Sequence, residues 1–125
     1  MKFFTILLFI LLLTTGCKTT PIQTLSQEPI RIDQWSLDKY WVQTNTAFSV
    51  KTNNYNMPKK GGFVNIEYLI DSNGNIFNPT IVKSDSTGAW NKFALKALSN
   101  MKYENSKTNT QKIPVYVVTE FIFGI

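Results

Sequence analysis

The sequence contains no histidine and only one cysteine, Cys17, in 125 residues. A single cysteine excludes an internal disulfide framework, so stability has to come from packing. The absence of histidine removes the usual general base and the commonest neutral metal ligand near pH 7. The remaining residues assemble neither a phosphate-cradling glycine loop nor a paired-carboxylate cleft. We therefore expect a protein that is not an enzyme and that carries no cofactor or metal.

Clustered charge is also lacking, because the modest excess of basic residues is spread along the chain. Lysine and arginine number 13 against 8 aspartate and glutamate residues, and the only adjacent basic pair is Lys59-Lys60. Nucleic-acid-binding domains normally show clustered basic residues within a recognisable module. We expect no nucleic-acid partner.

The first residues have the order of a signal peptide. Lys2 is followed by an apolar run over residues 3–13, broken only by Thr5, and then by the small residues 14–16. A run of about 11 residues spans roughly 16 Å as a helix, whereas a bilayer core of about 30 Å needs about 20 residues. The pattern predicts a signal peptide over residues 1–16 rather than a permanent membrane-spanning helix.

The next residue gives this signal a specific character. Residues 13–17, Leu-Thr-Thr-Gly-Cys, resemble the lipobox at which lipoprotein signal peptidase cuts before a lipidated cysteine. The resemblance implies lipid on Cys17, attachment to a membrane and a periplasmic location. Lys18 stands where an aspartate would mark retention at the inner membrane, which favours the outer membrane. The alternative is an ordinary secretory signal whose cleavage falls near a cysteine.

Residues 17–45 are expected to form the lipidated N-terminus, a tether and an irregular segment. Residues 18–29 are polar, contain Pro21 and Pro29, and lack apolar periodicity. About 12 such residues cover at most roughly 40 Å, which keeps the folded part near its membrane. Farther along, Trp35 and Trp41 fit no clean period. They either cover an open end of the core or stack on a ligand.

The segment from residue 46 to 125 is expected to be one domain. Residues 63–70 alternate apolar and polar side chains, which predicts a half-buried strand. Asn73-Gly74 supplies hairpin-turn chemistry, and residues 76–84 return as the partner strand, with Pro79 at a bulge or an edge. Oxygen-bearing residues at positions 71, 73 and 75 also faintly resemble a calcium loop, but a hairpin turn explains the same letters.

After this hairpin the hydrophobic period changes from strand to helix. Residues 89–101 are predicted to be helical, with Ser86 and Thr87 as candidate caps. The apolar residues of this helix recur at spacings of three and four and form one stripe: Trp90, Phe93, Ala94, Ala97, Leu98 and Met101. A polar connection over residues 104–112 leads to a terminal strand over 113–125. The fold class is therefore α+β, a small antiparallel three-stranded sheet with one helix packed on it in the order β-β-α-β.

Four pieces of this domain, in their order and spacing, resemble the TonB C-terminal domain over roughly residues 55–125. They are Gly-Phe-Val-Asn-Ile-Glu-Tyr-Leu-Ile-Asp-Ser-Asn-Gly at 62–74, Ile-Val-Lys-Ser at 81–84, Phe-Ala-Leu-Lys-Ala-Leu at 93–98, and Pro-Val-Tyr-Val-Val-Thr-Glu-Phe-Ile-Phe at 114–123. The resemblance implies a periplasmic domain that grips an extended segment, the TonB box, of an outer-membrane transporter by adding it to the sheet as a strand.

A terminal strand is a natural sheet edge whose free backbone groups can pair with an incoming peptide. We therefore expect an envelope protein to bind along residues 115–123, or the edge to be covered and both strand faces to be buried structurally. The expected contact residues are Val115, Tyr116, Val117, Val118, Thr119, Glu120 and Phe121. The Tyr-Pro element of the family reads Tyr55-Asn-Met-Pro58 here, and Tyr55 is expected to add a contact. An exposed terminal edge would also allow two copies to pair as a homodimer.

Full transducers of this family carry a membrane-spanning helix coupled to a proton-driven motor and a long proline-rich spacer. A lipobox and a short tether stand in their place here, which implies binding without energy transduction. The alternative is an accessory envelope lipoprotein that keeps the fold, has lost TonB-box binding, and acts as a subunit through an aromatic surface around Trp35 and Trp41.

Overall fold

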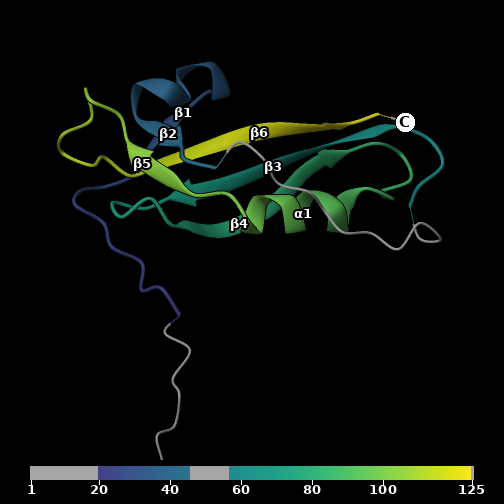
Figure 1. Cartoon of the computed structure of the whole chain (residues 1–125), viewed down its shortest axis with the longest axis horizontal. Helices are drawn as coiled ribbons and strands as arrows, with labels where there is room; N and C mark the ends of the chain where they lie inside the picture. Colours follow the sequence, from purple (N-terminus) through teal and green to yellow (C-terminus); the bar gives the residue numbers. More distant parts are fainter. Residues whose placement is uncertain (1–19, 46–56, 125) are drawn as a thin grey trace, which may run out of the picture.

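The computed structural model describes residues 20–45 and 57–124 (Figure 1). Its elements, in chain order, are β1 (Ile30–Ile32), the 3-10 helix η1 (Gln34–Lys39), β2 (Trp41–Gln43), β3 (Gly62–Ile70), β4 (Ile76–Ser84), α1 (Asn91–Ser99), β5 (Tyr103–Asn105) and β6 (Val115–Phe123). Among the described residues, no helix is long and apolar enough to cross a membrane.

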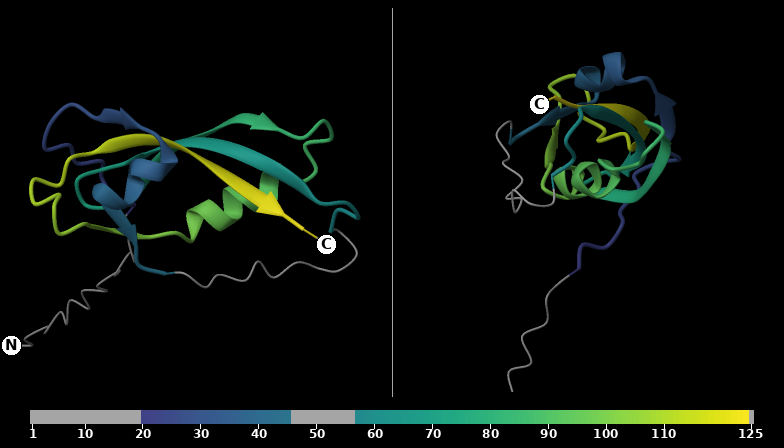
Figure 2. Two further views of the ribbon diagram at one scale, coloured as in Figure 1. Left: turned by 90° about the horizontal axis from the view of Figure 1, so that it is seen from above. Right: turned by 90° about the vertical axis from the view of Figure 1, so that its right-hand side faces the viewer.

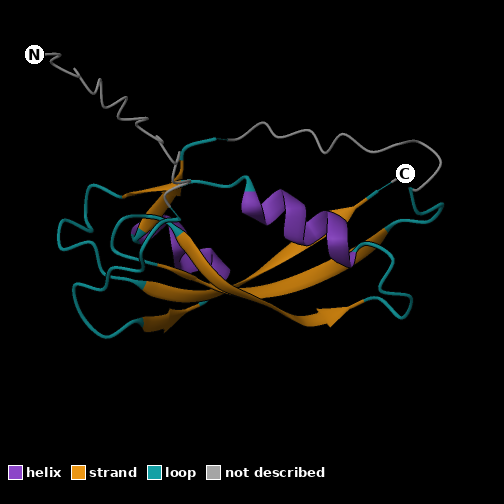
Figure 3. Ribbon diagram, turned by 90° about the horizontal axis from the view of Figure 1, so that it is seen from below, coloured by secondary structure: helices purple, strands orange, loops and turns teal. Residues whose placement is uncertain are grey.

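The main sheet has four strands in the order β1-β6-β3-β4. Strand β3 pairs antiparallel with both β4 and β6, and α1 lies across one face of the sheet (Figure 3). The predicted α+β class and β-β-α-β order are confirmed. The prediction of a three-stranded antiparallel sheet is wrong in one respect, because β1 adds a short parallel strand beside β6. A separate two-stranded sheet joins β2 to β5.

The core lies between α1 and the inner face of the sheet. Alternate residues of β3 and β6 point toward the helix, as the sequence pattern predicts, and the helix contributes its apolar stripe. The buried members are Trp41, Val64, Ile66, Tyr68, Ile70, Trp90, Phe93, Ala94, Leu98, Met101, Tyr103, Val115 and Val117. Each large aliphatic or aromatic side chain in this set stabilises the fold by roughly 1.5–3 kcal/mol through burial.

Helix α1 is shorter than predicted and begins differently. Ser86 and Thr87 do not cap it; Trp90 occupies the N-cap position and its side chain makes no capping bond. Instead, the Asp85 carboxylate accepts hydrogen bonds from the backbone N–H groups of Thr87 and Gly88, at 3.1 Å each, and closes a turn ahead of the helix. The hydrogen bond from the Thr87 side chain is the main cause that lowers the pKa of Asp85.

The packed unit extends upstream of residue 46, since β1, η1 and β2 pack against it. The two tryptophans of this segment differ in burial, because Trp41 is buried whereas Trp35 is 85% exposed. The indole N–H of Trp41 donates to the Ile113 carbonyl at 2.8 Å. β5 also forms where a polar connection was expected. Trp41 therefore belongs to the core, and the expected joint aromatic surface is reduced to Trp35.

The stretch expected to be a free tether is partly docked. The Thr24 N–H donates to the Asp71 carboxylate at 2.9 Å, and the Ser26 N–H donates to the Ser72 hydroxyl at 2.8 Å. Asp71 is fully buried and also accepts from the N–H groups of Asn73 and Asn75, so it closes its own turn and holds the upstream chain. Two further views show that the chain enters at the end of the domain opposite the C-terminus (Figure 2).

Candidate functional site

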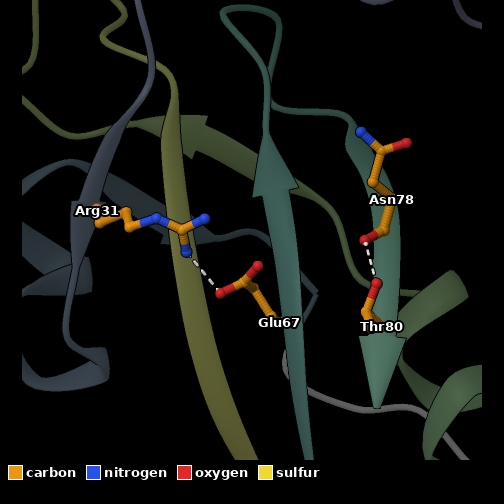
Figure 4. Close-up of polar contacts among 4 residues, drawn as sticks. All are labelled: Arg31, Glu67, Asn78 and Thr80. Atoms are coloured by element: carbon orange, nitrogen blue, oxygen red, sulfur yellow. Dashed lines mark hydrogen bonds and ion pairs between the residues drawn. The ribbon is translucent and has the colours of Figure 1, made fainter. Parts of the chain in front are cut away.

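A four-stranded sheet has two edges, and β4 forms one of them. Its pairing with β3 is interrupted by register shifts, and Asn78 adopts a positive φ of 53° directly before the exposed Pro79. The Thr80 hydroxyl folds back toward the Asn78 carbonyl at 3.4 Å (Figure 4). A bulge and a proline are the usual devices that keep an edge from pairing. The prediction that Pro79 lies at a bulge or an edge is confirmed, and β4 is a poor template for another strand.

The other side of the sheet is only partly closed. Ile30, Arg31 and Ile32 pair in parallel with Val115, Tyr116 and Val117, and the Ile30 N–H donates to the Pro114 carbonyl at 3.1 Å. The expectation that the whole of β6 is a free edge is therefore wrong for its first three residues. Val115 and Val117 are also buried, at 0% and 1% exposure, so their side chains are structural.

Beyond Val117, no described strand pairs with the outer side of β6. The chain leaves this edge because the Asp33 side chain accepts from the Ser36 N–H and starts η1. The outer N–H of Glu120 donates to the Gln34 side-chain oxygen at 3.1 Å. Since backbone groups alternate in direction along a strand, Ile122 points its N–H and carbonyl to the same outer side as Glu120. We define the open edge as residues 118–123 of β6.

The open edge carries apolar side chains on both faces of the sheet. On the outer face, Val118 is 37% and Ile122 is 76% exposed, with Glu120 exposed between them. On the inner face, Phe121 and Phe123 are half-buried, and Phe123 stacks on Trp90 with ring centroids 4.5 Å apart. An extended peptide placed here could form backbone hydrogen bonds and bury apolar surface on both of its sides.

A hydroxyl cluster fixes the inner face of β6 beneath the open edge. The Tyr68 hydroxyl lies 2.8 Å from the Tyr103 hydroxyl and 3.0 Å from that of Thr119. Burial raises the pKa of Tyr103 and of Tyr68 above the ordinary value of 10.0. Thr119 therefore belongs to a structural hydrogen-bond network, although it lies within the open edge.

These raised pKa values predict a loss of stability in alkali. Unfolded tyrosines ionise near pH 10 while the buried pair stays protonated, so its stabilising contribution is complete below about pH 10 and decreases above it. The loss should approach about 1.4 kcal/mol per phenol for each further pH unit. Urea unfolding between about pH 9 and about pH 11 measures it. A Tyr103→Phe variant should lose stability less steeply, and an equal slope would contradict the assignment.

The remaining expected site residues lie outside the described residues, namely Cys17 and Tyr55. Sequence reasoning overlooked Gln34, which covers an N–H of the open edge, and Arg31, whose strand covers the neighbouring part of β6. The alternation Ile30-Arg31-Ile32 was a usable signal for a strand, but three residues are too few for periodicity to show.

Comparison with known proteins agrees with this fold. The family model described as the Gram-negative bacterial TonB protein C-terminal matches residues 56–125. The solution NMR structure of the Pseudomonas aeruginosa TonB C-terminal domain is similar with a TM-score of 0.54 and 15% sequence identity, covering 68% of this chain and 86% of that one. At that identity the likeness concerns the fold. A search of the curated proteins found no match.

Proposed function

Because the chain belongs to the family of Gram-negative bacterial TonB protein C-terminal domains, we propose that it captures an extended segment of an envelope protein by adding that segment to the sheet at the open edge. Domains of this family lie in the periplasm and generally bind envelope proteins. The observation that carries the proposal is the outer side of residues 118–123, which lies next to a strand already held there and faces away from β3.

The contact set follows from the same geometry. Val118, Glu120 and Ile122 offer backbone groups and exposed side chains, whereas Phe121 offers part of its ring on the inner face. Tyr116 is covered by β1 and contributes only if that strand is displaced. An incoming segment replaces the Gln34 oxygen as the acceptor of the Glu120 N–H. This exchange costs little, because a single exposed hydrogen bond is worth about 1 kcal/mol.

The second half of the proposal is attachment through lipid on Cys17 to the periplasmic face of the outer membrane. The supporting observations are the lipobox-like sequence and the docking of Thr24 on Asp71. With Thr24 held, the connection back to Cys17 spans at most about 25 Å. The domain would bind passively beside its membrane, without transducing energy, and an outer-membrane transporter is the favoured partner. Radiolabelled palmitate incorporation that disappears in Cys17→Ala tests the anchor.

Strand addition is tested by titrating the ¹⁵N-labelled domain with a TonB-box peptide. Amide shifts should concentrate at residues 118–123 and at Gln34. Two peptides are compared, each N-methylated at every second residue, in complementary sets. Methylation of the residues whose N–H groups face β6 should abolish binding, whereas methylation of the other set should be tolerated. Gln34→Ala, which removes the competing acceptor, should bind about two- to tenfold more tightly.

Unperturbed amides at residues 118–123 with millimolar peptide would sink strand addition. Equal binding of the two N-methylated peptides would also count against strand addition, since side-chain docking would then explain the binding. The second candidate function, an accessory envelope subunit, is favoured by the 85% exposed Trp35 on η1. It predicts that Trp35→Ala loses partners in an envelope pull-down while Gln34→Ala retains them.

A further inference from the structure

Strand β1 shows what chemistry this side of β6 accepts. Its two isoleucines, Ile30 and Ile32, are partly buried against the core, whereas Arg31 lies on the outer face. The Arg31 guanidinium sits 5.0 Å from the ring centre of Tyr116 and reaches across β6 to the Glu67 carboxylate at 2.6 Å (Figure 4). The pattern is aliphatic, basic, aliphatic.

A strand added along the open edge would lie in the same kind of environment as β1, on the same side of β6. A residue placed opposite Glu120 faces outward, and its neighbours, opposite Thr119 and Phe121, face the inner side beside the core. Glu120 is exposed on the outer face and pairs across the sheet with the neutral Asn65 of β3. Arg31–Glu67 is the only ion pair within residues 20–45 and 57–124, so no described cation neutralises Glu120.

We propose, on the basis of the strand addition proposed above, that the captured segment itself has an aliphatic-basic-aliphatic core, with its basic residue opposite Glu120. Opposite charges directly across two strands stabilise the pair, and like charges destabilise it. The two aliphatic neighbours enter the inner face as Ile30 and Ile32 do in β1. The ligand class is thus a cationic, β-branched extended segment of another protein.

A second copy of this chain fits the open edge poorly in the register that is centred on Glu120. If two β6 strands paired antiparallel in the register centred on Glu120, Glu120 would face Glu120 of the other copy, and like charges directly opposite are destabilising. The same acidic residue that selects a basic guest therefore disfavours edge-to-edge dimers in that register. Sedimentation of the whole domain with and without peptide measures whether it forms a dimer.

The test uses two peptides that are identical except at their centre, Ile-Arg-Ile in one and Ile-Glu-Ile in the other. Titrated into the whole domain by NMR at low salt, the arginine peptide should bind about three- to tenfold more tightly. Glu120→Lys should reverse the order, and Glu120→Gln should bring the two affinities together. Raising the salt concentration should shrink the difference, because the pair is exposed.

The outcomes separate this inference from strand addition itself. Equal affinities in the wild type, or an unchanged order in Glu120→Lys, overturn the basic-guest assignment while leaving strand addition intact. If neither of these peptides binds and a TonB-box peptide does not bind either, strand addition is overturned. Shifts confined to residues 30–32 and 115–117 would mean that the arginine peptide replaces β1 rather than extending beside it, which also overturns the assignment at Glu120.

Discussion

Replacing Gly74 with alanine is expected to destabilise the fold by about 3 kcal/mol or more, one of the largest losses available from adding a single methyl group. Gly74 has a φ of +80°, a conformation that side chains rarely adopt. A Cβ atom there would lie 2.1 Å from the Tyr103 carbonyl oxygen. That oxygen belongs to the backbone of β5 and cannot rotate away, so relief requires separating the β3–β4 turn from the β2–β5 sheet.

Two other glycines provide matched controls. Gly124→Ala meets nothing within 4 Å and should change the free energy of unfolding by no more than about 0.5 kcal/mol. Gly88 has a φ of +60°, but a Cβ atom there would lie 3.1 Å from the flexible side chain of Asn91. Gly88→Ala should therefore lower the free energy of unfolding by about 1–2 kcal/mol. Urea unfolding of all three variants gives the comparison. Equal losses at positions 74 and 88 would show that the Tyr103 contact carries no cost.

Replacing Asp71 with alanine should have a comparable effect. Its carboxylate is fully buried and accepts backbone N–H groups from Thr24 at 2.9 Å, Asn73 at 3.0 Å and Asn75 at 2.9 Å. Hydrogen bonds to a charged group are each worth about 1.5–3 kcal/mol, and removal leaves three donors without their acceptor. We expect the free energy of unfolding, measured with urea, to fall by about 3 kcal/mol or more, because water can replace the lost acceptor for only some of the three N–H groups.

The Asp71→Ala variant also has a local signature. Hydrogen exchange at Thr24 should accelerate more than exchange in β3, since the upstream segment loses its docking point while the sheet is retained. Asp85→Ala is the matched control, because that carboxylate closes a similar turn through N–H groups of Thr87 and Gly88 but is only half-buried. It should lose less stability than Asp71→Ala. A larger loss at Asp85 would contradict the importance given to burial at Asp71.

The docking at Asp71 also bears on function. The hydrogen bonds to Thr24 and Ser26 lie at the β3–β4 turn, and β6 runs from that end of the domain toward its C-terminus (Figure 2). The chain therefore approaches from one end, and the open edge extends toward the other. A lipid attached at Cys17 would leave residues 118–123 at the far end from the membrane, accessible to a segment that projects into the periplasm.

The sequence by itself determined the elements whose pattern is local. Alternation over residues 63–70, the Asn-Gly turn and the stripe of apolar residues on the helix each specify a buried face, and the structure has β3, the turn and α1 there. The order of these pieces was also enough to identify the family. Local periods succeed because burial of one face imposes a repeat of 2 or 3.6 residues on the side chains.

Only the tertiary structure decided which part of the sheet edge is covered. The pairing of Ile30 with Val115 uses backbone groups that every residue type possesses, so no side-chain pattern announces it. Gln34 and Glu120 are separated by 86 positions, and the burial of Trp41 but not Trp35 likewise depends on contacts from distant segments. Periodicity specifies the faces of a strand, whereas long-range backbone pairing specifies its free edge, and the proposed site of this protein is such an edge.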